Sequence, residues 1–251
     1  MAEFKDHFSR QSTGYGLYRP HYPDELFHKL AALSAGHQRV WDCGCGTGQA
    51  AHGLARHFEQ VVATDASAKQ IGQAVPHERI DYRVASAESS GLDDSSVDLV
   101  LVAQALHWFE FDRFYEEVSR VSRNGGILAV VAYGLLRIDD RIDPVVDHLY
   151  HDLLGEYWPA ERRHIDNGYS SIPFPFRRLP VEEMVLQADW SFDHFCGYLE
   201  TWSAVQRYRD DRGRCPIAGV QNALQSAWGD RSDICTIRWP LYLLIGQVDQ
   251  S

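Results

Sequence analysis

Three glycines at alternate positions, Gly44, Gly46 and Gly48, follow a short apolar run and open a helical stretch. Glycine lets the backbone turn sharply and approach a ligand closely, and the first turn of a helix offers free backbone N–H groups. The dinucleotide fingerprint G-x-G-x-x-G needs its last glycine one position later, where Gln49 stands. The spacing therefore predicts a ligand-binding loop and argues against the alternative of a nicotinamide-dependent oxidoreductase.

Two further positions fit a nucleoside ligand. Asp65 ends the second β-rich run, about 20 residues beyond the loop, where a carboxylate can accept hydrogen bonds from both ribose hydroxyls. Ala87-Glu88 follows the third run and is placed to flank an adenine ring. Asp65 could instead cap a helix, so these positions gain their weight from occurring together with the glycine loop.

Taken as a set, these residues resemble the class I S-adenosylmethionine (SAM)-dependent methyltransferases. The matching motifs are Asp42-x-Gly44-x-Gly46-x-Gly48, Asp65, Ala87-Glu88 and the turn Asn124-Gly125-Gly126. Further motifs resemble the branch that includes the trans-aconitate methyltransferases, with a methyltransferase type 11 domain: Tyr18-Arg19-Pro20-x-Tyr22-Pro23, Ala103–Phe109, Tyr198-Leu199-x-Thr201-Trp202-Ser203 and Trp239–Tyr242. The resemblance extends roughly from Phe8 to Val248.

The resemblance implies SAM as cofactor, S-adenosylhomocysteine (SAH) as product, and no metal. The cofactor-binding residues that it implies are Tyr18, Arg19, Asp42, Gly44, Gly46, Gly48, Asp65, Ala66, Ala87, Glu88, Gln104 and Ala105. Among them, Asp42 would brace the glycine loop, Tyr18 and Arg19 would contact the methionyl carboxylate, and Gln104 would lie beside the sulfonium. His107 and Trp108 would face the acceptor and are the catalytic candidates, although the pair could also be buried packing at a strand end.

The elements that must position these residues alternate along the chain. Short β-rich runs occur at 39–43, 60–65, 80–85, 97–102 and 127–133, with helical stretches at 48–58, 67–74 and 110–123 between them. This alternation predicts an α/β fold with a doubly wound, mostly parallel sheet. The resemblance implies the seven-stranded, Rossmann-like order 3-2-1-4-5-7-6, with an antiparallel seventh strand and a helical lid insertion.

We expect a single methyltransferase domain over residues 1–251. Its parts are an N-terminal cap at 1–36, a SAM-binding core at 37–134, a lid insertion at 135–180, and C-terminal strands and helices at 181–251.

Composition excludes several classes of partner. The formal net charge is −11 and no basic block is longer than two residues, which argues against nucleic-acid binding. No apolar run is long enough to span a membrane, and Met1–Arg10 has no signal-peptide core.

Five cysteines without a disulfide spacing favour a reducing, cytoplasmic setting, and Cys43-Gly44-Cys45 has no second pair at a zinc spacing. We expect a monomer or homodimer.

The expected lid and the helices after it are rich in cations and aromatic rings. The cations are Arg162, Arg163, His164, Arg177, Arg178, Arg207 and Arg209; the rings are Tyr157, Trp158, Tyr169, Phe174, Phe176, Trp202 and Tyr208. Arginine forks bind carboxylates, so an anionic small-molecule acceptor and O-methylation of a carboxylate are expected. Two alternatives remain: N- or O-methylation of another group with His107 as base, and SAM binding by a regulatory protein without turnover.

Overall fold

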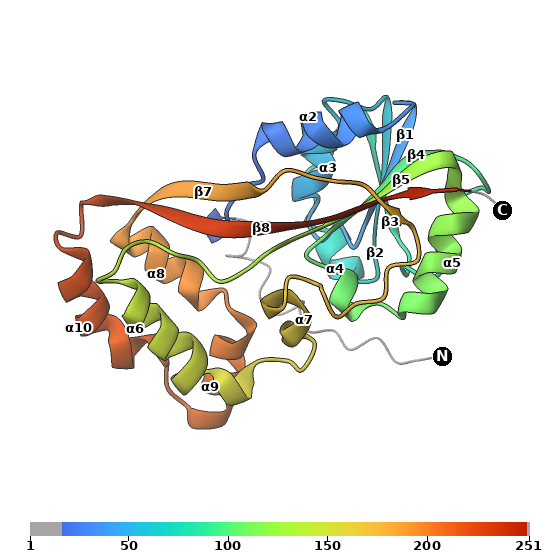
Figure 1. The fold of residues 1–251 in the computed structure, drawn as a ribbon. Helices are drawn as coiled ribbons and strands as arrows, with labels where there is room; N and C mark the ends of the chain where they lie inside the picture. Colours follow the sequence, from blue (N-terminus) through green and yellow to red (C-terminus); the bar gives the residue numbers. More distant parts are fainter. Residues whose placement is uncertain (1–16, 250–251) are drawn as a thin grey trace.

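An open, twisted sheet runs through the molecule (Figure 1). The structure is a computed structural model and describes residues 17–249. The sheet has eight strands in the order β3-β2-β1-β4-β5-β8-β6, and β7 also pairs with β8. The strands are β1 (Arg39–Cys43), β2 (Gln60–Asp65), β3 (Ile80–Val84), β4 (Val97–Ala103), β5 (Ser122–Tyr133), β6 (Arg177–Arg178), β7 (Met184–Ser191) and β8 (Ile234–Val248).

The strand order confirms the expected fold with one addition. The strands β1 to β5 pair with one another in parallel, and β8 is antiparallel to both β5 and β7. The expected sixth and seventh strands are β7 and β8, so the expected order is found, with β6 as an extra two-residue piece paired to β8 at Gly246 and Gln247. The expected turn at Asn124-Gly125-Gly126 lies inside β5, where the ladder to β4 shifts register.

Both faces of the parallel strands are buried because their side chains alternate and both sets are apolar. Val40 belongs to one face and packs in a cluster with Leu54 of α3, whereas Trp41 belongs to the other and packs with Phe114 and Val118 of α5. The helices of this half are α2 (Asp24–Leu33), α3 (Gln49–Leu54), α4 (Ala68–Ile71), the 3₁₀ turn η1 (Leu106–Trp108) and α5 (Phe111–Val121).

A second, helical lobe packs against one side of the extended β7 and β8 (Figure 1). Its elements are α6 (Asp143–Asp147), the π-helix η2 (His148–Leu153), the 3₁₀ turn η3 (Gly155–Tyr157), α8 (Phe192–Glu200), α9 (Ser203–Arg212) and α10 (Ile217–Trp228). The short helix α7 (Arg162–Asp166) lies between this lobe and the parallel strands, where it contacts η1. Trp239 of β8 is fully buried in its core, against the rings of Trp190 and Tyr198. The residues expected to form the lid thus connect the sheet to this lobe.

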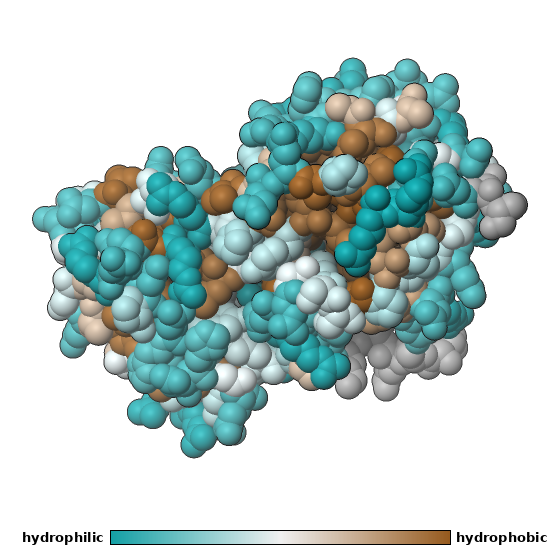
Figure 2. Space-filling view, viewed as in Figure 1, coloured by the Kyte–Doolittle hydropathy of each residue, from teal (hydrophilic) through white to brown (hydrophobic). Residues whose placement is uncertain are grey.

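The face of the molecule seen in Figure 2 is mostly hydrophilic at its outer edges, and hydrophobic residues gather on it where β8 crosses the parallel strands. Among residues 17–249, no helix is both long and apolar enough to cross a membrane. The part of the expected N-terminal cap at 1–16 lies outside the described residues.

Candidate cofactor and acceptor site

A cavity of about 940 Å³ opens at the carboxyl ends of β1, β2 and β4. From β1 the chain adds β2 and β3 on one side of the sheet, and it then crosses to β4 on the other side of β1. The cavity therefore lies where the strand order reverses, which is the usual ligand site of such sheets. Most of the expected cofactor-binding residues line it: Arg19, Asp42, Gly44, Gly46, Asp65, Ala66, Ala87, Glu88, Gln104 and Ala105.

The glycine loop has the left-handed backbone that glycine permits. The φ angles of Gly44, Gly46 and Gly48 are 72°, 56° and 87°. A Cβ on Gly48 would lie 2.2 Å from the hydroxyl oxygen of Tyr82, so this glycine shapes the loop without lining the cavity. A Cβ on Gly46 would meet no atom within 4 Å, because Gly46 faces the open cavity. The loop therefore leaves room for a ligand directly against its backbone.

Asp65 is held at the cavity wall by the backbone of two loops. One carboxylate oxygen accepts a hydrogen bond from the Gly46 N–H at 2.9 Å, and the other accepts from the Ser67 N–H at 2.8 Å. The carboxylate at the end of β2 is thus tied to the glycine loop after β1. This geometry fixes the relative position of the two elements expected to hold the ribose and the methionyl part of SAM.

Asp42 is a buried carboxylate that lines the cavity from beneath the glycine loop. Within the described part of the chain, neither of its oxygens makes a hydrogen bond, although the Ala51 backbone N–H faces it. Burial, together with the charge of Asp65, raises the pKa of Asp42 from 3.8 to about 7. A buried acceptor of this kind needs a cationic or hydrogen-bond-donating ligand group.

The side chains of Tyr18 and Arg19 point in different directions although the two residues are adjacent in the chain. The Tyr18 ring packs on α8, with its centroid 5.2 Å from that of His194, and it lines neither cavity described here. Arg19 points into the site, where it donates to the Tyr133 hydroxyl at 3.0 Å and to the Thr201 carbonyl at 3.1 Å. The structure therefore brings Arg19, and not Tyr18, to the cofactor cavity.

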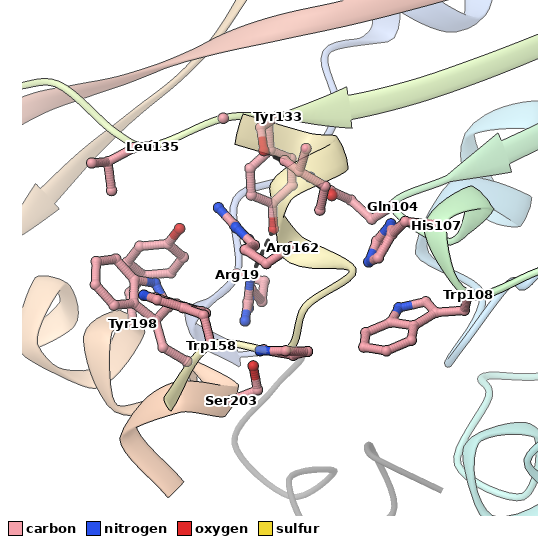
Figure 3. Close-up of a pocket in the computed structure, with 14 residues that line it drawn as sticks. Arg19, Gln104, His107, Trp108, Tyr133, Leu135, Trp158, Arg162, Tyr198 and Ser203 are labelled. Carbon is pink, nitrogen blue, oxygen red and sulfur yellow. Dashed lines mark hydrogen bonds between the residues drawn. The ribbon is translucent and has the colours of Figure 1, made fainter. Parts of the chain in front are cut away.

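A smaller cavity of about 70 Å³ adjoins the first (Figure 3). Both are lined by Arg19, Gln104, His107, Trp108 and Tyr133, which form the junction between them. Gln104 has a left-handed φ of 58°, uncommon for a residue with a side chain, and its amide nitrogen donates to the Tyr133 carbonyl at 3.3 Å. The strained residue therefore lies at the junction between the two cavities.

His107 is buried at this junction, and its Nδ1 lies 2.8 Å from the Tyr169 hydroxyl. Burial, reinforced by the charges of Arg162 and His164, lowers the pKa of His107 from 6.5 to about 3. The imidazole is therefore neutral at physiological pH. A base with a pKa this low is poorly matched to removing a proton from a hydroxyl or an amine.

Arg162 supplies a cation to the smaller cavity. Its Nε donates to the Tyr150 hydroxyl at 2.8 Å, and its guanidinium carbon lies 5.1 Å from the centroid of the Trp158 ring. Figure 3 shows Arg19 and Arg162 in the middle of the cavity, between the Tyr198 and Trp158 rings on one side and His107 and Trp108 on the other.

Other expected residues of the acceptor pocket have different places. Trp158, Trp202 and Arg162 line the smaller cavity and His164 lines the larger one. Neither cavity is lined by Arg163, Arg177, Arg178, Arg207, Arg209, Tyr157, Tyr169, Phe174, Phe176 or Tyr208. Sequence reasoning missed Tyr133, which ends β5 beside Gln104; its place at the carboxyl end of a parallel strand is the signal that could have found it. Within residues 17–249, no three His, Cys, Asp or Glu side chains gather as a metal site would require.

The fold and the cavity define a SAM-binding α/β protein, and comparisons with known proteins agree. Residues 41–130 match a family model described as a methyltransferase domain. A Dictyostelium discoideum protein classed as a methyltransferase is 32% identical over 254 residues, covering 98% of this chain and 96% of that protein. An uncharacterized methyltransferase of Mycobacterium tuberculosis is 42% identical over 116 residues, covering 45% of this chain and 46% of its own length.

A solved structure from Anaeromyxobacter dehalogenans, described as a type II methyltransferase, shares 45% identity at a TM-score of 0.88, covering 93% of this chain and 99% of that one. The chain belongs to the class I SAM-dependent methyltransferases. It is an enzyme that transfers the methyl group of SAM to an acceptor.

Proposed function

We propose that this enzyme methylates a carboxylate oxygen of a small molecule. The observation that carries the proposal is the guanidinium of Arg162 in the smaller cavity, beside the neutral His107 and the ring of Trp158. Arginine binds carboxylates through paired, charge-assisted hydrogen bonds, and aromatic walls accommodate an apolar tail.

The chemistry of the junction favours an acceptor that needs no base. A carboxylate is ionised at neutral pH and can attack directly. A hydroxyl or an amine would have to lose a proton, and His107, with its pKa lowered to about 3 by burial, is a weak candidate for taking it. This argues against the alternative in which His107 acts as the base.

We assign the cofactor-binding residues as follows. Asp42 and the loop of Gly44, Gly46 and Gly48 would hold the methionyl part of SAM, with Arg19 at its carboxylate; Asp65 would hold the ribose, and Ala66, Ala87 and Glu88 the adenine. SAM supplies an activated methyl group on a sulfonium sulfur. Gln104 and Ala105 would place that sulfur at the junction, and the protein contributes alignment and exclusion of water.

The size and cover of the smaller cavity support a small acceptor. Its volume of about 70 Å³ is several times the ~10–15 Å³ that one water molecule needs by the same measure. We propose that segment 135–180 acts as the lid, because Trp158 and Arg162 belong to it and line this cavity. Tyr198 and Trp202, which stand in a motif that resembles the trans-aconitate methyltransferase branch, line it too and support a place for the chain in that branch.

The test is methyl transfer to matched acids and amides. The enzyme is incubated with SAM labelled in its methyl group and with pairs such as butyrate and butyramide, followed by treatment with base. A methyl ester releases its label as volatile methanol, whereas an N-methyl or ether product does not. We expect base-labile label from acids only. Label confined to base-stable products would refute carboxylate methylation.

A further inference from the structure

We propose that Tyr169 is a positioning residue: it holds His107 in the neutral form that carries its proton on Nε2, so that His107 donates a hydrogen bond to the acceptor carboxylate. The donated bond and the absence of a base would make the site selective for acceptors that are already ionised. The proposal rests on the proposed function for the identity of the acceptor, but its assignment of Tyr169 does not depend on which acceptor is bound.

Tyr169 lies behind His107, away from both cavities. Its side chain is 1% exposed and it lines neither cavity, so it cannot touch the acceptor. Its hydroxyl is 2.8 Å from Nδ1 of His107, which turns that edge of the imidazole toward the protein interior. His107 lines both cavities, so the Nε2 edge of the ring is the one that reaches them (Figure 3).

The hydrogen bond of the Tyr169 hydroxyl determines the tautomer. Within residues 17–249, Nδ1 of His107 is the side-chain atom that this buried hydroxyl contacts, and a phenol proton directed elsewhere would be buried without an acceptor, so the phenol donates to Nδ1. Burial raises the pKa of Tyr169 above its ordinary value, so the phenol keeps that proton. An imidazole that accepts at Nδ1 and is neutral must carry its proton on Nε2.

The backbone around Tyr169 indicates a fixed and costly placement. Tyr169 has a left-handed φ of 60°, which is strained for an aromatic residue, and Gly168 before it has a φ of 58°. The Tyr169 N–H bonds to the His164 carbonyl at 2.7 Å, closing a turn after α7. The same turn follows the helix that carries Arg162, so one segment positions both the cation and the tyrosine.

The charged groups around His107 point to an anion. Arg162 and His164 of α7 lower its proton affinity, and Arg19 lines the same cavity. No Asp or Glu is among the described residues that line the smaller cavity, although Asp166 pairs with Arg162 from outside it at 3.3 Å. The acids that share the larger cavity with His107 are Asp42, Asp65, Glu88, Glu110 and Glu161. In the reaction the sulfur–methyl bond breaks with its electrons remaining on sulfur, and a carboxylate oxygen forms the new bond to the methyl carbon. The Nε2 proton stays on His107 throughout.

The experiment is ¹⁵N NMR of the full chain labelled in histidine, with SAH bound and the His107 signals identified by their loss in His107→Gln. We expect a neutral ring with its proton on Nε2 between pH 5 and pH 8, and on addition of butyrate, not butyramide, a downfield shift of the Nε2 proton. A ring protonated on Nδ1, or one that titrates near ~6.5 as an ordinary histidine does, would overturn the proposal.

Tyr169→Phe tests the positioning role, with Tyr115→Phe as the matched control. Tyr115 is also a buried tyrosine of the same core cluster, but its hydroxyl donates to the Pro173 carbonyl and not to His107. We expect Tyr169→Phe to give a mixture of His107 tautomers and to raise the KM for the acid acceptor ~10-fold, with a smaller change in kcat. An unchanged tautomer in Tyr169→Phe, or an equal change in Tyr115→Phe, would refute the role.

The two proposals can fail separately. In one case the enzyme forms no methyl ester, His107 carries its proton on Nε2, and Tyr169→Phe gives a mixture of tautomers. That result would refute carboxylate methylation and uphold the assignment of Tyr169. Ester formation with a His107 ring protonated on Nδ1 would uphold the function and refute the assignment.

Discussion

Asp42→Asn should stabilise the cofactor-free protein and at the same time weaken SAM binding. Asp42 is fully buried, and within residues 17–249 its oxygens make no hydrogen bond. Its charge is therefore costly in the absence of a ligand, and the cost would be recovered only when a cationic ligand group lies beside it.

The magnitude follows from the pKa of Asp42, which burial and the charge of Asp65 raise from 3.8 to about 7. A difference of about 3 pH units corresponds to about 4 kcal/mol at 1.36 kcal/mol per unit. The folded state holds this proton more tightly, so stability falls as pH rises from about 4 to 7 and the full penalty applies above 7. A buried asparagine costs about 1–3 kcal/mol itself. The net gain at pH 8 is therefore about 2 kcal/mol, or about 4–8 °C in Tm for a chain of this size.

The assay is thermal unfolding of both proteins at pH 5 and pH 8, with and without SAM. The gain should shrink at pH 5, and at pH 8 the variant should lose at least ~10-fold in SAM affinity. Asp98→Asn is the matched control, because Asp98 is equally an acid at the sheet but accepts from the Gln38 and Arg39 backbone N–H groups and pairs with Arg123. Asp98→Asn should destabilise. A destabilised Asp42→Asn with unchanged SAM affinity would refute the reasoning.

Three further results are expected. Asp65→Ala should weaken SAM and SAH binding ~10-fold or more in isothermal titration, because the carboxylate orders the loop through the Gly46 N–H; equal affinity in both proteins would contradict this. Arg162→Met should raise the acceptor KM ~10- to 100-fold with little change in SAM affinity. Arg163 is the exposed neighbour, and Arg163→Met should change neither quantity. Equal effects of the two substitutions would count against the acceptor site. Gly48→Ala should abolish SAM binding or folding, because its Cβ would overlap the ring of Tyr82. Gly46→Ala should fold and lose only SAM binding, because its Cβ meets no atom. Circular dichroism measures the folding of each variant and titration measures its SAM binding.

Much of the fold could be predicted from the sequence because its signals are local. Apolar runs bounded by glycines and helical stretches mark β1 to β5, and the family resemblance supplied the order of the last two strands. The short strand β6 has no such signal. Arg177 and Arg178 read as a surface pair, and only their pairing with β8 makes them a strand.

The gathering of the expected cofactor-binding residues around one cavity was also predictable, since most of them follow directly after strands whose carboxyl ends must meet at one edge. The directions of adjacent side chains were harder to predict. Tyr18 and Arg19 are neighbours in the chain, yet the Tyr18 ring packs in the space beside Gly197, whereas the Arg19 side chain points into the site.

The proposed acceptor site depends on packing between lobes, which sequence patterns do not carry. Arg162, Arg177 and Arg209 each pair with an acid, Asp166, Asp249 and Glu200 respectively. Of these three arginines, Arg162 lines the smaller cavity. The contact between His107 and Tyr169 joins residues 62 positions apart. Burial and neighbouring cations lower the pKa of His107, and this argues against the alternative in which His107 acts as a base.

The most direct test is a crystal structure of the enzyme with SAH and butyrate. We expect the SAH sulfur beside Gln104 and its ammonium near Asp42. The butyrate carboxylate should lie in the smaller cavity, within hydrogen-bond distance of Arg162 and of Nε2 of His107. Butyrate bound elsewhere, with the smaller cavity closed by side chains, would contradict this expectation.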